Sequence, residues 1–363
     1  MFFNISTAID SRFPNNYQFD NLWINCDDGW KIQGKTFYKG YCDNDCYLIV
    51  TDSAIQIKNT GLRSFPLWYQ DGAVNNIEPL ANQAWVDNLV EIDQQGTVCT
   101  SKVQVDYSVP NRTITTADAK RQIKLILDQK LKSVPARLKL FCSGGLDTLL
   151  LYGMLSQQHS FDLVTDEHYE SNNFTDNNKQ LLNNFWAYKQ IHHWNDPTWL
   201  ATGSHGDEYF LRGPATIAML TAWHGINFGE LLADNPNCYH YYYFNKYSDL
   251  WHNTWADRQK LKEEYPTIEL LHCQIMNILI NDHQHWHLGN TLTWTPFKDI
   301  EIARILLQCD INDLLPQFID GRLSKDLIID YNDNIIDYLS QYKNYNKNEN
   351  LSKLFEYHAK LAK

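Results

Sequence analysis

Residues 138–148 read Leu-Lys-Leu-Phe-Cys-Ser-Gly-Gly-Leu-Asp-Thr, and the apolar run 149–155 follows at once. The apolar residues before the glycines predict a short buried strand, and those after them predict a helix. A strand that enters a helix through a glycine turn brings free backbone N–H groups to the positive end of the helix dipole, which favours an anion there. The stretch therefore predicts an α/β fold with an anion site after the strand.

The side chains of this turn suit a phosphate group that carries a divalent cation. Gly144 and Gly145 let the backbone approach a phosphate closely, and Ser143 and Thr148 add hydroxyl donors. Asp147 supplies a carboxylate for a Mg²⁺ ion that bridges phosphates. No Lys-Ser/Thr pair follows the glycines, so the stretch is not a Walker loop. The alternative interpretation is a glycine turn that joins a strand to a helix without any ligand.

The segment 143–148 resembles the SGGxDS/T loop of the N-type ATP pyrophosphatases, which split ATP between the α and β phosphates and transfer AMP to a substrate oxygen. The resemblance implies a doubly wound parallel sheet of the adenine nucleotide α-hydrolase-like type. It also implies that ATP binds at Ser143, Gly144, Gly145, Leu146, Asp147 and Thr148.

Composition limits the class of protein. The chain has 363 residues, 44% of them hydrophobic, which is enough for two domains with a sizeable core. Its net charge of -12 argues against nucleic-acid binding through broad electrostatics. No apolar stretch approaches the roughly 18 residues of a membrane span. The eight cysteines are ordinary for a reduced protein. We therefore expect a cytoplasmic protein with no membrane partner.

The pattern changes along the chain and predicts two domains with a tail. Residues 1–112 look β-rich, with strand candidates at 47–50, 54–57 and 103–107 and turns such as Asn15-Asn16. A polar break at 109–113 precedes a helix that Thr115 or Thr116 caps, with apolar positions at Ile123, Leu125, Ile126 and Leu131. Strands and helices then alternate through 113–340, which indicates a parallel sheet, and 341–363 is a polar tail.

A second glycine-containing acidic turn, Thr202–Phe210, looks like the SGxGxDExF segment of asparagine synthetases. A magnesium ion on a triphosphate is held better by two protein carboxylates than by one, so Asp207 is the expected partner of Asp147. The resemblance places Gly203 and Gly206 in the nucleotide site. The alternative is an acidic pair at a helix N-terminus, where negative charge is favoured.

Two further segments resemble the same family. Thr295–Asp299 looks like its PFLD segment, and we expect Asp299 mainly to cap the helix that follows. Gly321–Leu327 resembles its GKxxKxxLR segment, which implies that Lys325 reaches the α-phosphate and the acyl-adenylate centre and that Arg322 takes the earlier basic position. The alternative for Lys325 is a solvated surface lysine.

Residues 115–335 as a whole resemble the synthetase domain of class B asparagine synthetases and their β-lactam synthetase relatives, because these segments occur in the family's order. The resemblance implies an AMP-forming and pyrophosphate-forming ligase that uses ATP and Mg²⁺. Its substrates would be a small-molecule carboxylate, aspartate by family default, and ammonia or an amine. Argininosuccinate synthetases share the first loop, but the later segments do not suit them.

Two departures separate the chain from that family. The family's glutaminase domain needs a cysteine at the mature N-terminus, where this chain has Phe2, so we expect no glutamine hydrolysis and treat 1–112 as a reduced relic of that domain. The family places a glutamate or an aromatic residue at Ser204, and His205 is the available substitute base. A lactam or peptide cyclase, a non-catalytic nucleotide-binding scaffold and a transferase on tRNA remain alternatives. The oligomeric state stays open.

Overall fold

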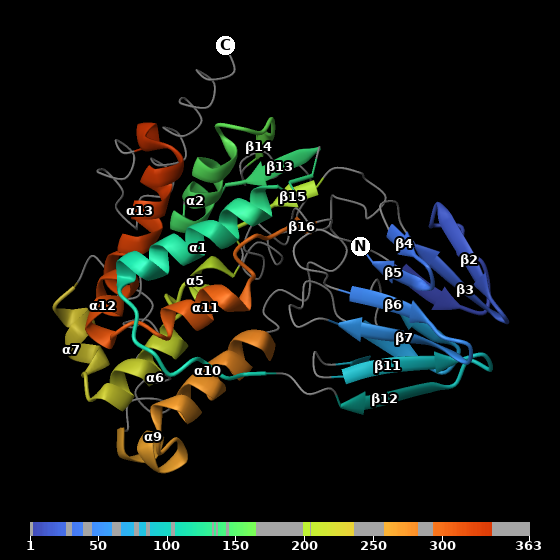
Figure 1. The fold of residues 1–363 in the computed structure, drawn as a ribbon, viewed down its shortest axis with the longest axis horizontal. Coiled ribbons are helices and arrows are strands. Elements are labelled where there is room, and N and C mark those ends of the chain that lie inside the picture. Colours follow the sequence, from blue (N-terminus) through green and yellow to red (C-terminus); the bar gives the residue numbers. More distant parts are fainter. Residues whose placement is uncertain are drawn as a thin grey trace, which may run out of the picture.

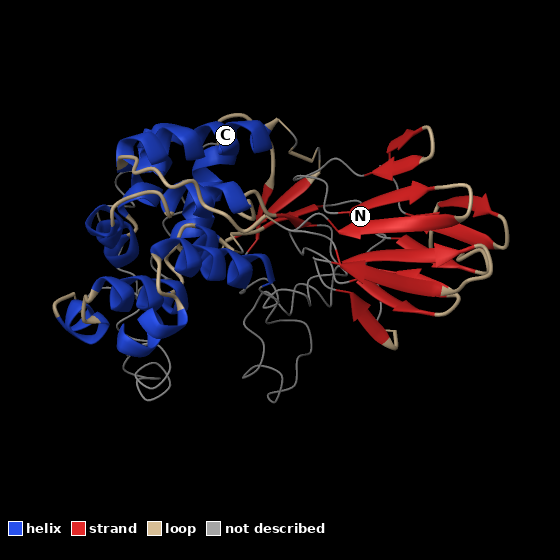
Figure 2. Ribbon diagram, turned by 60° about the horizontal axis from the view of Figure 1, so that its bottom comes forward, coloured by secondary structure: helices blue, strands red, loops and turns tan. Residues whose placement is uncertain are grey.

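Three β-sheets and a set of helices form the protein, as the computed structural model in Figure 1 shows. The structure describes residues 3–26, 31–38, 46–59, 67–75, 80–84, 88–102, 106–132, 134–135, 137–142, 145–164, 199–203, 205–235, 258–281 and 293–335. Figure 2 shows that most strands gather at one end of the molecule and the helices at the other.

The first part of the chain forms two antiparallel six-stranded sheets. One has the order β10 (Asn82–Ala84), β8 (Leu67–Gln70), β9 (Ala73–Asn75), β1 (Phe3–Ser6), β3 (Leu22–Cys26) and β2 (Asn15–Phe19). The other has the order β12 (Val98–Lys102), β11 (Asn88–Asp93), β7 (Ala54–Asn59), β6 (Cys46–Val50), β5 (Thr36–Tyr38) and β4 (Lys31–Gln33).

One apolar core joins these two sheets. Buried side chains alternate along the strands, as in β1 and β11, because successive residues of a strand point to opposite faces. Phe3, Ile5 and Ile24 from one sheet meet Ile55 and Ile57 from the other in a single cluster. The β-rich character expected for this region is therefore confirmed.

The second part of the chain contains a parallel sheet of four strands. Its order is β14 (Asp162–Val164), β13 (Leu138–Phe141), β15 (Trp199–Ala201) and β16 (Thr293–Trp294). The predicted strand before the glycine turn is therefore confirmed, and so is the mixed α/β class of the chain. Leu138 and Leu140 are buried, as the apolar run requires.

Helices lie next to this sheet (Figure 1). They are α1 (Thr116–Leu131), α2 (Leu146–Leu155), α5 (Gly206–Tyr209), α6 (Pro214–His224), α7 (Phe228–Ala233), α9 (Arg258–Glu264), α10 (Ile268–Asn281), α11 (Ile300–Leu306), α12 (Ile311–Asp320), α13 (Arg322–Tyr331) and the short 3-10 helix η3 (Asp333–Ile335). Among these helices none combines the length and the apolar character needed to cross a bilayer.

Several local predictions can be compared with the structure. Thr115 caps α1, because its hydroxyl accepts a hydrogen bond from the N–H of Asp118. Leu125 does not join the core: it is 63% exposed, whereas Leu127 is fully buried. The pair Asn15-Asn16 does not form a turn but begins strand β2, since cross-strand pairing with β3 overrides the local preference of asparagine.

The third strand candidate, 103–107, is also wrong where it can be checked. Strand β12 ends at Lys102, and Asp106 and Tyr107 lie in a loop, while 103–105 lie outside the described residues. The carboxylate of Asp106 accepts the N–H of Ser108 at 2.9 Å, which is a turn interaction that competes with strand pairing. The tail 341–363 also lies outside the described residues.

Candidate functional site

The candidate site begins where β13 and β15 end. The chain runs from β13 to β14 on one side and returns to β15 on the other, so the strand order reverses between β13 and β15. In open parallel sheets, the loops that leave two such strands diverge and make room for a ligand. Here those loops are the glycine turn before Asp147 and the acidic turn around Asp207.

Helix α2 starts directly after the first of these loops. Gly145 occupies the N-cap position with extended backbone, and no side chain accepts a hydrogen bond there. The first-turn N–H groups of α2 are therefore not capped by Gly145. The hydroxyl of Thr148 donates to the carbonyl of Gly145 at 2.9 Å, so its hydrogen is used inside the turn. Ser143 and Gly144 lie outside the described residues.

Gly203 and Gly206 bring the second loop directly against α2. A Cβ atom on Gly203 would lie 2.9 Å from Cβ of Asp147 and 3.0 Å from Cγ2 of Thr148. A Cβ atom on Gly206 would lie 2.7 Å from Cβ of Asp147 and would overlap its carboxyl group. Both glycines thus allow two loops distant in sequence to pack without an intervening side chain.

The second loop holds an unusual backbone conformation. His205 and Leu211, which flank α5, adopt left-handed φ values of 66° and 54°, which are strained for residues with a side chain. The carbonyl of Asp207 accepts the N–H groups of Arg212 and Gly213 at 2.6 and 2.8 Å. This tight return brings the Arg212 side chain back to the aspartate that begins the turn.

Arg212 connects the two predicted carboxylates. Its Nη2 atom forms an ion pair with Oδ1 of Asp147 and another, at 2.7 Å, with Oδ1 of Asp207. The side chains of Arg212 and Asp147 are only 8% and 16% exposed, whereas that of Asp207 is 39% exposed. The two aspartates therefore face one common position, and its open side lies at Asp207.

The electrostatics of this group are dominated by burial. Burial, with a smaller contribution from the negative charge of Asp207, raises the pKa of Asp147 to about 7, although the Arg212 guanidinium acts in the opposite direction. One guanidinium faces two carboxylates, so the group carries an excess of negative charge when both are ionised.

The residues at this position fit a divalent cation that is shared with phosphates. Both Oδ1 atoms contact the same nitrogen atom of Arg212, so the two carboxylates converge on one position. Mg²⁺ prefers oxygen ligands and commonly takes one or two protein carboxylates, with the remaining positions filled by phosphates and water. Among the described residues no group of three His, Cys, Asp or Glu side chains could hold a metal without such a ligand.

Helix α13 completes the surroundings of Arg212 and α2. Gly321, with a φ of 68°, precedes it, and a side chain at Gly321 would overlap Leu146 and stand 3.3 Å from Nη1 of Arg212. The carboxamide oxygen of Gln317 accepts the N–H groups of Leu323 and Ser324 at 2.7 and 3.2 Å. These first-turn donors of α13 are thus already used inside the protein.

The two basic residues predicted on α13 differ in their surroundings. Lys325 is half-buried in the second turn, and its backbone N–H donates to the carbonyl of Gly321. Arg322 is 64% exposed and makes a long ion pair of 3.6 Å with Asp320. The helix of Lys325 therefore starts beside Leu146 and Arg212, whereas the Arg322 side chain extends into solvent.

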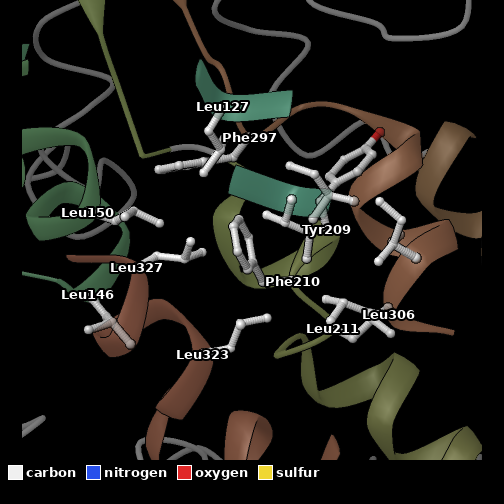
Figure 3. Close-up of a cluster of buried hydrophobic side chains, with 14 of the residues drawn as sticks. Leu127, Leu146, Leu150, Tyr209, Phe210, Leu211, Phe297, Leu306, Leu323 and Leu327 are labelled. Atoms are coloured by element: carbon white, nitrogen blue, oxygen red, sulfur yellow. The ribbon is translucent and has the colours of Figure 1, made fainter. Parts of the chain in front are cut away.

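A shared apolar core brings the predicted segments together. Figure 3 shows Leu146, Phe210, Phe297, Leu323 and Leu327 within one cluster of buried side chains. The rings of Phe210 and Phe297 meet edge to face, with centroids 5.6 Å apart. Described residues of all the segments that resemble the family thus pack into one core, although they are far apart in the sequence.

The capping role predicted for Asp299 is confirmed. Its carboxylate accepts the N–H of Glu301 at the start of α11 at 2.9 Å. The same carboxylate forms an ion pair of 2.9 Å with Lys130 of α1, and both side chains are nearly buried. Asp299 therefore fixes the position of α11 against α1.

The position of His205 is also defined. It is 4% exposed, and its ring meets that of Tyr209 edge to face, with centroids 5.9 Å apart. The Tyr209 hydroxyl in turn donates to the carbonyl of Leu279 on α10. His205 therefore packs into the protein interior, and Ser204 lies outside the described residues.

Sequence reasoning missed Arg212. The signal was available: an arginine directly follows the three apolar residues Tyr209, Phe210 and Leu211. A cation in such a run is either exposed or paired with a buried carboxylate, and two aspartates were already expected nearby.

No model of a known protein family matches the chain, and a search of curated proteins finds no match either.

Proposed function

We propose that the protein is an ATP-dependent, AMP-forming ligase that activates a carboxylate and joins it to an amine. The observation that carries this proposal is the convergence of Asp147 and Asp207 on one position at the reversal of the strand order. The order of the four parallel strands supports a doubly wound sheet of the ATP pyrophosphatase type. The single buried apolar cluster that contains the α2 side chains is consistent with it.

The nucleotide would bind with its phosphates at the start of α2. The backbone N–H groups there and the helix dipole favour an anion, and Gly145 leaves the approach open. Asp147 and Asp207 would hold Mg²⁺, which neutralises charge on the phosphates when it is bound. Arg212 contacts both aspartates, and Lys325 lies on α13, which begins after Gly321 beside Leu146 and Arg212.

Two bond exchanges make up the proposed reaction. A substrate carboxylate oxygen attacks the α-phosphorus, the bond to the bridging oxygen of the β-phosphate breaks, and pyrophosphate leaves. The amine nitrogen then attacks the acyl carbon of the adenylate, AMP leaves with the bonding electrons, and the amine loses a proton. In this proposal Lys325 stabilises the negative charge that develops at the α-phosphate. Aspartate with ammonia is the default pair of substrates.

ATP–pyrophosphate exchange with a panel of carboxylates tests the proposal. We expect exchange with at least one carboxylate, and a loss of exchange in Lys325→Gln. The control is Arg121→Gln, which removes an exposed cation paired with Asp118 on α1 and keeps the activity of the parent protein. Absence of exchange with every carboxylate, together with absence of Mg·ATP binding, contradicts the proposal.

A nucleotide-binding scaffold without catalysis is the second candidate, and one observation favours it. Arg212 already contacts both carboxylates, as an arginine in a structural ion-pair network does. Binding of Mg·ATP without any pyrophosphate exchange supports the scaffold, whereas exchange excludes it. A lactam or peptide cyclase differs only in the amine, and an intramolecular product identifies it.

A further inference from the structure

Arg212 stands where a divalent cation would touch the two aspartates. Its Nη2 atom contacts Oδ1 of both Asp147 and Asp207, so this nitrogen lies at the point that a shared metal ion needs. We propose that Arg212 is an internal counter-cation, which holds the two aspartates together without metal and is displaced from them by a divalent cation. This inference rests on the proposed function for the identity of the nucleotide.

The guanidinium and the metal cannot share these oxygens. Mg²⁺ binds oxygen at about 2.0–2.1 Å, and its inner shell leaves no place for a nitrogen in contact with both ligands. Two cations at this distance also repel each other strongly in a buried site. Metal binding to the Oδ1 atoms therefore requires the Arg212 side chain to move away, and the loss of its ion pairs opposes metal binding.

A second buried ion pair shows why this arrangement is more than structural. Lys130 and Asp299 pair one cation with one carboxylate, and the same carboxylate also caps α11. At Arg212 one cation contacts two carboxylates, so a metal ion can supply further positive charge there when both are ionised.

The displaced guanidinium has an anionic ligand close by if a nucleotide is bound. A guanidinium binds phosphate oxygens in pairs and retains its charge in buried surroundings. Gly321 lacks a side chain next to Nη1, so the space beside the guanidinium is free of a Cβ atom. Arg212 thus exchanges the two carboxylates for phosphate oxygens when the metal and the nucleotide bind together.

Opposite effects on two ligands follow from this exchange. Arg212→Gln removes the competitor, so Mn²⁺ alone binds at least about 10-fold more tightly than to the parent protein. The same change removes a phosphate partner, so Mg·ATP binds about 10-fold more weakly. An arginine with a purely structural role gives losses for both ligands.

The experiment measures Mn²⁺ binding by electron paramagnetic resonance and Mg·ATP binding by calorimetry on the full chain. Melting curves are recorded in EDTA and in millimolar Mg²⁺. Arg212→Gln should melt lower than the parent in EDTA, because two carboxylates then lie together without a cation, and Mg²⁺ should restore much of the loss. The matched control Lys130→Gln also loses a buried cation, but Mg²⁺ should not restore its melting temperature.

Arg212→Lys keeps the positive charge beside the two carboxylates but loses the planar fork, and its Mn²⁺ affinity should lie above that of the parent. Unchanged or weaker Mn²⁺ binding in both variants overturns the proposal. This proposal and the proposed function can fail independently. If the parent protein catalyses pyrophosphate exchange but the Arg212 variants do not bind Mn²⁺ more tightly, only the role of Arg212 is contradicted. If the variants bind Mn²⁺ more tightly but the parent shows no exchange, only the catalytic proposal is contradicted.

Discussion

Two buried ion-pair groups join distant parts of this chain, and they differ in balance. Lys130 pairs with the single carboxylate of Asp299, which also caps α11. Arg212 pairs with two carboxylates from two loops that meet beyond the ends of neighbouring strands. The single carboxylate of the first group both pairs with Lys130 and caps α11, whereas in the second group one guanidinium faces two carboxylates beside the N-terminus of α2.

This difference helps to distinguish a structural ion pair from a candidate functional site. Burial alone does not do so, because Lys130 and Arg212 are buried to a similar extent. The surplus carboxylate, the two strained residues around α5 and the reversal of strand order occur together only at Arg212 among the residues that the structure describes. Substitutions in the Arg212 group and matched substitutions in the Lys130 group should therefore have different effects.

The largest expected effect is on pyrophosphate exchange. Asp147→Asn or Asp207→Asn should lower the exchange rate roughly 100-fold or more, because each removes a charge that binds the nucleotide's cation. Asp299→Asn should keep exchange within a factor of about 3, although it loosens α11. Equal losses in all three variants would show that the two ion-pair groups do not differ in function.

The next effect concerns stability. Lys130→Met leaves the carboxylate of Asp299 buried without its cation, and should lower the free energy of unfolding by about 3 kcal/mol. The double variant Lys130→Met/Asp299→Asn should lose less than the sum of the single changes, since no buried charge remains unpaired. Urea unfolding of the three variants measures this. Additive losses would mean that the pair carries no coupling.

A smaller effect distinguishes two glycines around α2. Gly206→Ala places a methyl group into Asp147 and should lower the free energy of unfolding by roughly 2 kcal/mol while weakening nucleotide binding. Gly153→Ala, inside α2, places its methyl group at ordinary contact distances of 3.6–3.7 Å. It should be neutral or stabilising by up to about 1 kcal/mol, because alanine favours a helix. Thermal melts of both variants test the packing of the two loops. A lower melting temperature for Gly153→Ala than for Gly206→Ala would contradict it.

The pH dependence of stability has opposite signs at two residues. Burial raises the pKa of Asp147 from 3.8 to about 7, so between these values the native state holds a proton that the unfolded chain has released. The contribution of Asp147 to stability therefore falls as pH rises through this window. Burial lowers the pKa of His272 from 6.5 to about 4, so there the unfolded chain binds the extra proton and stability rises with pH.

Urea unfolding at pH 5 and pH 7 measures both contributions. Relative to the parent, Asp147→Asn should gain stability between pH 5 and pH 7, whereas His272→Gln should lose it. Each variant serves as the control of the other, because a general change in the protein would shift both in one direction. The same sign in both variants would contradict the assignment.

The sequence was most informative where the chemistry is local. The strand and helix around the glycine turn, the Thr115 cap and the Asp299 cap all follow from neighbouring residues, and all are confirmed. The turn predicted at Asn15-Asn16 was wrong, because these residues pair with strand β3, and this pairing cannot be seen in the neighbouring residues. The run before Arg212 indicated a buried carboxylate partner, but which carboxylates it contacts depends on how β13 and β15 lie together in space.

The most direct test of the central claim is a calorimetric titration of Mg·ATP into the parent protein and into Asp147→Asn, Asp207→Asn and Asp299→Asn. We expect a binding heat for the parent and for Asp299→Asn, and none at millimolar Mg·ATP for the other two variants. No heat with the parent, or an unchanged heat with Asp147→Asn and Asp207→Asn, would contradict the claim that these two carboxylates hold the cation of a bound nucleotide.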